Sequence, residues 1–275
     1  MNECKIIAIA NQKGGTAKST TACNLSIALA DAGYRVLCVD MDPQANLTMV
    51  LGVDTTDELL VTMHDLLTSK MDKQRKNQLL DKSEYIIHSE KVDLIPTNIK
   101  LTDSESNLRN EMGGEYILSE LLEPLRQDYD YIVIDTSPSI GKLTINALAT
   151  CDSVIIPVNP QLWSAVGLTD LLQTIYLIQS RINPRIKIDG ILMTICDERT
   201  ILFRDTRDML IRLCKDEIRI FDTCIPSTVM VGKANYSSVS IMEFDANSKA
   251  AIAYTQFAKE VVGHECIYEK ASATA

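Results

Sequence analysis

One stretch near the N-terminus combines glycines, lysines and hydroxyl side chains at a spacing that suits phosphate binding. Its residues are Lys13, Gly14, Gly15, Thr16, Ala17, Lys18, Ser19 and Thr20. Glycines let a backbone turn until several N–H groups point at one anion, and a helix that follows adds its free N–H groups. We expect Lys18 to reach the β- and γ-phosphate oxygens of a nucleotide and the Ser19 hydroxyl to ligate Mg²⁺. The alternative is a glycine-rich turn with two surface lysines.

Carboxylates follow two apolar runs farther along the chain. Asp40 and Asp42 come after the first run, and Asp135 ends the second. Ligands of open α/β sheets bind at the carboxyl ends of strands. We hypothesise that Asp40 and Asp42 orient the water that attacks the γ-phosphate and help to hold the Mg²⁺ shell, although one of them could only cap its loop. The candidate metal ligands are Ser19, Asp42 and Asp135.

The apolar residues change period repeatedly between the patterns of strands and helices. Short apolar runs predict strands at about residues 6–10, 36–39, 92–96, 131–135, 154–158 and 190–194, with a weaker one at 222–225. Helical spacing after the glycine-rich loop predicts further helices at about residues 57–82, 104–127, 141–150, 166–181, 204–217 and 247–262. This alternation predicts an α/β fold, a mostly parallel twisted sheet with helices on both faces in a three-layer sandwich. We expect a single domain at residues 1–263 and a loose tail at residues 264–275.

Composition limits the classes of protein to which the chain can belong. Its 275 residues are 46% hydrophobic, which is not the composition of a disordered chain. No apolar run approaches the roughly 18 residues that a membrane span needs. The formal net charge of −10 disfavours a general polyanion binder, because such proteins cluster lysines and arginines.

The cysteines and the start of the chain indicate the compartment. Eight cysteines are scattered, and no two have the C-x-x-C spacing of many zinc and iron–sulfur sites. We expect them to be small buried side chains in a reducing compartment. The N-terminal residues do not have the pattern of a secretory signal, so we expect a cytoplasmic protein.

The glycine-rich loop departs from the standard pattern G-x-x-x-x-G-K-[ST], because Gln12 and Ala17 occupy its two glycine positions. It resembles the deviant Walker A loop K-G-G-x-G-K-[ST] of the ParA/MinD superfamily, and the run N-Q-K-G-G is similar to ParA in particular. Residues 40–46 resemble the ParA motif D-x-D-P-Q-G-N, with Ala45 in place of glycine. Residues 135–139 resemble its D-x-P-P-S segment. The resemblance covers nearly the whole chain.

The resemblance implies a P-loop ATPase of the ParA/Soj type with ATP and Mg²⁺ as cofactors. In that family the first lysine of the loop reaches across a homodimer that forms on ATP binding. The implied catalytic residues are Lys13, Lys18, Asp40 and Asp42. Thr194 and Pro226 would lie beside the adenine. The resemblance also implies slow hydrolysis, a ParB-like stimulator and nonspecific DNA binding, in the partition of a plasmid, a mobile element or a chromosome.

Several positions depart from the family pattern. Ala17 and Ala45 replace glycines, and a positive φ at Ala17 would carry a backbone penalty on the order of 1 kcal/mol. The family has R-x-V-R-L-S-E-A where residues 227–234 lack the arginines. Upstream, between residues 199 and 219, four acidic residues accompany six basic ones: Arg199, Arg204, Arg207, Arg212, Lys215 and Arg219. This stretch is either a DNA-binding face or an ordinary solvated helix of mixed charge.

Three functions therefore remain open. The first is the partition switch, the second is a positioning or regulatory ATPase of the same fold that carries a protein cargo without DNA, and the third is a nucleotide-binding scaffold with little turnover. No helix-turn-helix precedes the first strand, so operator binding is not expected. We expect no membrane partner, because one apolar helical face would pack on the sheet rather than on lipid: Ala251, Tyr254, Phe257 and Val261.

Overall fold

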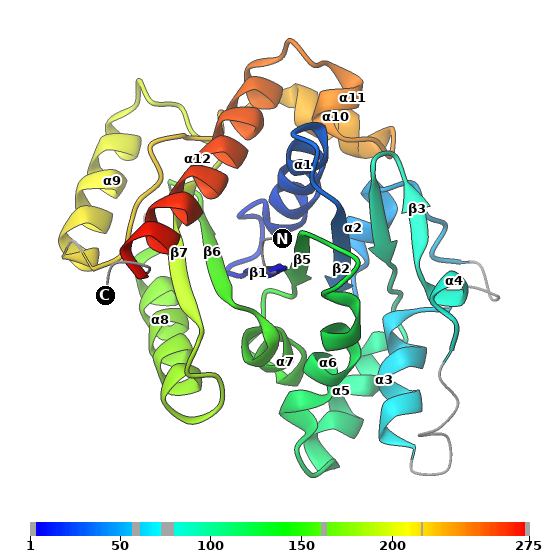
Figure 1. Cartoon of the computed structure of the whole chain (residues 1–275). Coiled ribbons are helices and arrows are strands. Elements are labelled where there is room, and N and C mark those ends of the chain that lie inside the picture. Colours follow the sequence, from blue (N-terminus) through cyan, green and yellow to red (C-terminus); the bar gives the residue numbers. More distant parts are fainter. Residues whose placement is uncertain (1–3, 57–60, 73–79, 161–163, 216, 273–275) are drawn as a thin grey trace.

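Seven strands form one sheet in the computed structural model, which describes residues 4–56, 61–72, 80–160, 164–215 and 217–272 (Figure 1). They are β1 (Lys5–Ile9), β2 (Val36–Met41), β3 (Ile87–Ser89), β4 (Val92–Ile95), β5 (Tyr131–Thr136), β6 (Ser153–Val158) and β7 (Lys187–Met193). Their order across the sheet is β3-β4-β2-β5-β1-β6-β7, and every neighbouring pair is parallel except β3 with β4. The predicted α/β fold with a mostly parallel sheet is confirmed.

The central strands are buried on both faces. Every residue of β2, β5 and β6 is buried, and their sequences are rich in valine and isoleucine, which suit a strand covered on both sides. β1 lies between β5 and β6 near the middle of the sheet. Each parallel neighbour requires a crossover connection, so helices cover both faces.

The helices on one face come from both ends of the chain. They are α1 (Lys18–Asp31), α2 (Asn46–Val50), α10 (Val229–Tyr236), α11 (Ile241–Phe244) and α12 (Lys249–Ser272). Figure 1 shows α12 running past α1, and these two helices pack against each other. The predicted apolar face of α12 is 2% exposed or less and joins the same core as α1, which confirms that it packs inside the protein: Ala251, Tyr254, Phe257 and Val261. Among the described residues, no helix has both the length and the apolar character to cross a membrane.

The opposite face is covered by helices from the middle of the chain. They are α3 (Met63–Met71), α5 (Leu101–Asn110), α6 (Ile117–Leu122), α7 (Lys142–Thr150), α8 (Ser164–Arg181) and α9 (Ile201–Cys214). Three short elements complete this side: α4 (Lys82–Tyr85) and the 3₁₀ turns η1 (Gly114–Tyr116) and η2 (Glu123–Leu125). The sheet therefore has an apolar core on each side, and the three-layer arrangement is as predicted.

The helix predicted at residues 57–82 is shorter in the structure. α3 begins after Thr62, which forms a capping box with Asp65. The helix ends at Met71, and α4 is a separate turn. Residues 57–60 and 73–79 of the predicted helix lie outside the described residues.

The helix predicted at residues 104–127 is also interrupted. α5 ends at Asn110, and Gly113 then takes a φ of 72°, which is incompatible with a continuous right-handed helix. The chain resumes as η1 and α6, and Pro124 lies in η2. The apolar period continues across these breaks because both pieces face the same core.

The weak strand predicted at residues 222–225 is not a regular strand. The Asp222 and Thr223 N–H groups donate to the Glu260 carboxylate, whereas Ile225 forms backbone hydrogen bonds with Met193 and Cys196. The tail predicted from residue 264 includes the last residues of α12, whose backbone is helical to Ser272. No glycine or proline occurs between residues 264 and 272 to end the helix.

Candidate nucleotide-binding site

Three neighbouring strands end at one edge of the sheet and bring the predicted site residues there. β2, β5 and β1 are adjacent and parallel. Asp135 of β5 is in register with Ile9 of β1 on one side and with Asp40 of β2 on the other. The charges of Lys18, Asp40 and Asp42 all act on the Asp135 carboxyl group. The fold thus gathers the glycine-rich loop and the three aspartates at one place.

The loop between β1 and α1 is open. Gly14 and Gly15 are exposed, and a Cβ atom added at either would meet no atom within 4 Å. Gly15 has a φ of 72°, which glycine adopts without strain. α1 begins at Lys18 directly after Ala17, and no side chain caps the helix at this end. The N–H groups of its first turn are therefore suited to receive an anion.

Two residues outside the glycine-rich stretch hold its backbone. The buried Thr194 hydroxyl, directly after β7, donates a hydrogen bond to the Thr16 carbonyl at 3.0 Å. The Asn11 side chain accepts one from the Lys13 N–H at 2.9 Å and donates one to the Pro157 carbonyl at 2.6 Å. Asn11 is absent from the predicted site residues, although the ParA-like run that begins with it is a signal that could have identified it.

Lys18 is a buried cation within the site. It is 7% exposed, and its Nζ donates to the Lys13 carbonyl at 3.3 Å. Burial lowers the pKa of its ammonium group, whereas the charges of Asp135 and Asp42 raise it. The ammonium group is therefore held by the loop itself, where a phosphate oxygen could replace the carbonyl as its acceptor.

Asp40 is hydrogen-bonded within its own loop. Its Oδ2 accepts bonds from the Thr48 N–H at 2.9 Å and the Thr48 hydroxyl at 2.7 Å, and its Oδ1 accepts one from the Asp42 N–H at 3.0 Å. Burial raises the pKa of Asp40 to about 6, against the lowering effect of these bonds. The Thr48 hydroxyl also accepts a bond from the Thr97 N–H at 3.1 Å. Asp40 therefore fixes the segment that carries Asp42 and ties it to the end of β4.

Asp42 and Asp135 supply the carboxylates that a divalent cation needs. Both are buried, and within the described residues neither oxygen of Asp135 has a hydrogen-bond partner. Burial, and next the charge of Asp40, raise the pKa of Asp135 well above its ordinary value, although the nearby Ser19 hydroxyl, which does not reach hydrogen-bond geometry, lowers it. A buried carboxylate without a partner is unfavourable, and a cation with oxygen ligands would relieve it. Ser19, Asp42 and Asp135 therefore fit Mg²⁺.

Both alanines that replace family glycines have left-handed backbone conformations. Ala17 has φ 63° and ψ 34°, and Ala45 has φ 55° and ψ 31°. A side chain in this region costs about 1 kcal/mol or more relative to glycine. Each alanine stands at the position before a helix, α1 or α2, that begins beside the site. The site therefore contains backbone strain at two points.

Pro226 lies on a segment next to Thr194. An isolated parallel bridge pairs Pro226 with Cys196, two residues beyond Thr194. The structure thus places these two predicted adenine-side residues on adjacent segments. Pro226 is half-buried and Thr194 is fully buried.

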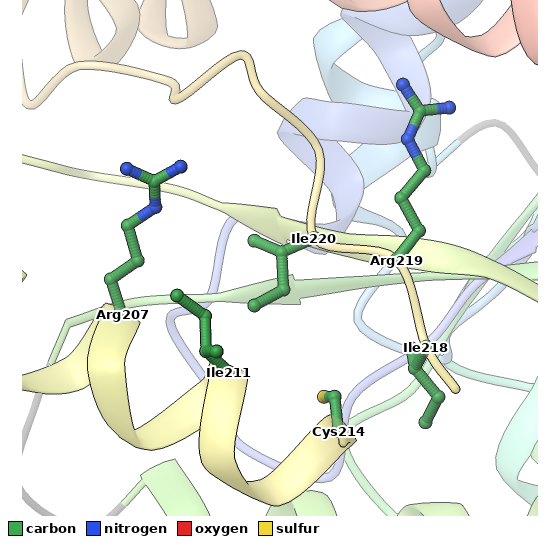
Figure 2. Close-up of a pocket in the computed structure, with 6 residues that line it drawn as sticks. All are labelled: Arg207, Ile211, Cys214, Ile218, Arg219 and Ile220. Carbon is green, nitrogen blue, oxygen red and sulfur yellow. The ribbon is translucent and has the colours of Figure 1, made fainter. Parts of the chain in front are cut away.

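The basic residues of the 199–219 stretch lie on and around α9, beyond β7 and away from the glycine-rich loop (Figure 1). Arg199 pairs with Asp197 at 2.9 Å, and Arg219 pairs with Glu260 at 3.2 Å. Figure 2 shows Arg207 and Arg219 on two sides of a hollow of 270 Å³, with their guanidinium groups pointing the same way. The hollow is lined by Arg207, Ile211, Cys214, Ile218, Arg219 and Ile220. Part of the positive charge is thus neutralised within the fold.

Sequence comparisons agree with this geometry. The AAA domain family matches residues 4–188. The sporulation initiation inhibitor protein Soj of Bacillus subtilis is 38% identical over 262 residues, which cover 94% of this chain and 99% of Soj. The chromosome partitioning protein ParA of Caulobacter vibrioides is 33% identical over 269 residues, or 96% of each chain.

A solved structure is similar over the same length. The cobyrinic acid a,c-diamide synthase from Mycobacterium smegmatis, with bound ATP analog and magnesium, is 34% identical and superposes with a TM-score of 0.79 over 95% of each chain. Motif, fold and sequence therefore agree from β1 to α12. The chain belongs to the ParA/Soj family of the ParA/MinD superfamily, the P-loop ATPases whose Walker A loop carries two lysines.

Proposed function

We propose that this protein is a switch that binds Mg-ATP, dimerises in that state and acts in the partition of a plasmid, a mobile element or a chromosome. The observation that carries the proposal is the Asp135 carboxylate, which is buried beside the glycine-rich loop with no hydrogen-bond partner among the described residues. The neighbouring Lys18 and the first turn of α1 favour an anion, whereas Asp135 favours a cation. A nucleotide with its Mg²⁺ satisfies both requirements.

Each residue at the phosphate end of the site has a proposed role. The N–H groups of the loop from Gly14 to Thr20 and the Lys18 ammonium group hold the phosphate oxygens. Ser19, Asp42 and Asp135 hold Mg²⁺, which when bound neutralises charge on the phosphates. Soj and ParA as relatives support this assignment.

The remaining residues position the attacking water, contact the second copy and lie beside the adenine. Asp42 positions the attacking water, and Asp40 acts through Asp42 by fixing its segment. Lys13 reaches the phosphates of the second copy in a homodimer. Thr194 and Pro226 lie at the adenine side. Slow hydrolysis returns the dimer to monomers in the cytoplasm.

DNA and a ParB-like stimulator are the partners that the family relationship favours. The basic residues around α9 are the surface available for the DNA backbone. Arg204, Arg207 and Arg212 on α9 would contribute most, because Arg199 and Arg219 already have acidic partners.

A second function is favoured by α10. Val229 and Tyr236 at its two ends are 76% and 94% exposed, in the region where the family carries arginines. Exposed apolar side chains suit a protein partner better than a phosphate backbone. A positioning or regulatory ATPase with a protein cargo and no DNA is therefore the alternative.

ATP binding and phosphate release separate these functions from a scaffold without turnover. We expect wild type to bind Mg-ATP and release phosphate slowly, Lys18→Ala to lose ATP binding, and Asp42→Ala to bind ATP without releasing phosphate. Lys249→Ala, at an exposed position that begins α12, is the matched control and should behave as wild type. Failure of wild type to bind ATP would contradict the proposal, and binding without phosphate release would favour the scaffold.

Duplex DNA then distinguishes the two active alternatives. We expect the ATP-bound protein to be retained on DNA at low salt and released as salt rises, because phosphate contacts are screened. The triple variant Arg204→Ala, Arg207→Ala, Arg212→Ala should lose retention while it keeps ATP binding. Retention that is absent at low salt in wild type would favour the protein-cargo function.

A further inference from the structure

The segment that follows β7 lies against a second segment through backbone hydrogen bonds. The Cys196 N–H donates to the Ile225 carbonyl at 2.9 Å, and the Ser227 N–H donates to the Cys196 carbonyl at 2.8 Å. The Ile225 N–H in turn donates to the Met193 carbonyl at 2.9 Å. These bonds fix Cys196 and Cys224 on adjacent stretches of backbone.

The two thiols interact with each other and have different surroundings. The Cys196 and Cys224 thiols are close enough that each shifts the pKa of the other. Cys196 is 4% exposed, whereas Cys224 is only partly buried. The interaction with Cys196 lowers the pKa of Cys224 and the Arg207 guanidinium group lowers it further, against burial and the charges of Glu198 and Glu260. The interaction with Cys224, and then burial, raise the pKa of Cys196, so Cys224 is the thiol of the pair that loses its proton more readily.

The five other cysteines whose side chains the structure describes lack this combination. Burial is the largest cause that raises the pKa of five thiols: Cys4, Cys23, Cys38, Cys151 and Cys214. Cys214 lines the hollow of Figure 2, but no second cysteine is among the residues that line it. A partly exposed thiol with a lowered pKa beside a second thiol is the arrangement of a redox-responsive pair. Within the described residues, Cys224 with Cys196 has this arrangement.

We propose that Cys224 and Cys196 form an oxidation site that reacts with hydrogen peroxide and closes to an intramolecular disulfide. The Cys224 thiolate attacks one peroxide oxygen, an S–O bond forms, the O–O bond breaks, and the released hydroxide takes a proton to become water. The Cys196 sulfur then attacks the Cys224 sulfenic acid, an S–S bond forms and the S–O bond breaks. The hydroxide leaves as water with the Cys196 proton. The two thiols lose two electrons, and the peroxide accepts them.

The disulfide can be mapped directly because trypsin separates the two cysteines. Residues 188–199 form a peptide with Cys196 as its one cysteine, and residues 220–233 form a peptide with Cys224 as its one cysteine. The reduced full-length protein is treated with hydrogen peroxide, alkylated, digested and analysed by mass spectrometry. We expect these two peptides to be recovered joined, lighter by two hydrogens than their sum, and to separate on reduction. Recovery of both as alkylated thiols, or of Cys224 joined to another cysteine, would overturn the proposal.

Two variants identify the order of the steps. Cys196→Ser should accumulate a Cys224 sulfenic acid that dimedone captures, because the resolving thiol is missing. Cys224→Ser should leave Cys196 as an alkylated thiol after the same treatment. Cys214→Ser is the matched control, and its peptides should join as in wild type. Dimedone capture at Cys196 in place of Cys224 would contradict the assignment of the attacking thiol, and a Cys196→Ser variant that does not fold leaves the wild-type mapping and Cys224→Ser to decide.

Discussion

The Asp40 carboxylate accepts two hydrogen bonds from one residue, Thr48, through the backbone N–H at 2.9 Å and the hydroxyl at 2.7 Å. Thr48 also accepts a hydrogen bond from the Thr97 N–H, so its hydroxyl joins β2 and β4 at the edge of the sheet where the site lies. All three residues are fully buried. The position of Asp42, which follows Asp40 by two residues, therefore depends on a threonine outside the motif.

Thr48→Val keeps the shape of this side chain but removes its hydroxyl. We expect a loss in the free energy of unfolding of about 1–3 kcal/mol, because the Thr97 N–H loses its acceptor and the Asp40 carboxylate loses a donor in a buried place. Denaturant unfolding with a fitted slope measures this loss.

Thr56→Val is the matched control for that change. Thr56 donates to Asp54 through its N–H and its hydroxyl in the same pattern, but both residues are exposed. Water replaces the lost hydroxyl there, so we expect little change in stability. If the two variants lost equal free energies of unfolding, the buried network around Asp40 would contribute no more to stability than the exposed Thr56–Asp54 pair.

Ala17→Gly removes the strain of a left-handed alanine in the phosphate loop. We expect the variant to be more stable than wild type by about 1 kcal/mol, since glycine adopts a φ of 63° without a steric penalty. We also expect tighter ATP binding, because Ala17 is partly exposed in the loop that would surround the phosphates. Thermal unfolding and equilibrium ATP titration measure the two effects.

The control for Ala17→Gly is an alanine with ordinary helical geometry. Ala253 lies within α12 and is partly exposed, so Ala253→Gly should lower stability by about 1 kcal/mol. A destabilised Ala17→Gly would mean that contacts of the alanine methyl group outweigh the backbone strain.

Ala45→Gly is expected to change the stability of the protein without changing its affinity for ATP. Ala45 has the same left-handed conformation, but it is buried and its N–H donates to the Asp42 carbonyl at 2.8 Å. We expect a gain in stability of about 1 kcal/mol with no gain in ATP affinity, because the residue is outside the phosphate loop. An increase in affinity as large as that of Ala17→Gly would contradict this separation.

The sequence alone identifies the parts of the site that short motifs encode. Lys18, Asp40, Asp42 and Asp135 each follow or end an apolar strand, and a parallel sheet necessarily brings such ends to one edge. The motif does not reveal that the oxygens of Asp40 are used within its own loop. That role depends on Thr48, eight residues later, and only the folded loop brings the two together.

The differences in secondary structure have local causes. β3 is absent from the predicted strands because its three residues include His88 and Ser89 at an exposed sheet edge, where no apolar run marks a strand. The break after α5 could have been anticipated from Gly113 and Pro124, which are turn signals inside an apolar pattern. The extension of α12 to Ser272 could not, because Gly263 is a residue type that commonly ends a helix.

Asp135→Asn should stabilise the ligand-free protein while it removes the response to Mg-ATP. The folded pKa of Asp135 lies well above its ordinary value, so the folded state holds this proton more tightly than the unfolded state. Its contribution to stability therefore falls as pH rises from the ordinary value toward the folded value, and wild type bears the full cost once pH exceeds the folded value. Asparagine has no such charge. We expect a higher melting temperature for the variant at pH 7 and a smaller difference near pH 4.

Asp130→Asn gives the opposite sign and serves as the control. The hydrogen bond from Arg35 lowers the pKa of Asp130, so its stabilising effect is present at neutral pH and is lost as pH falls through the folded value. This variant should be less stable than wild type at pH 7 by more than at pH 4. Mg-ATP should raise the melting temperature of wild type and of Asp130→Asn, and should leave that of Asp135→Asn unchanged. If Asp135→Asn were destabilised equally at both pH values, the Asp135 carboxylate would be a hydrogen-bond acceptor that the fold requires. Its proposed role as a cation ligand would then be contradicted.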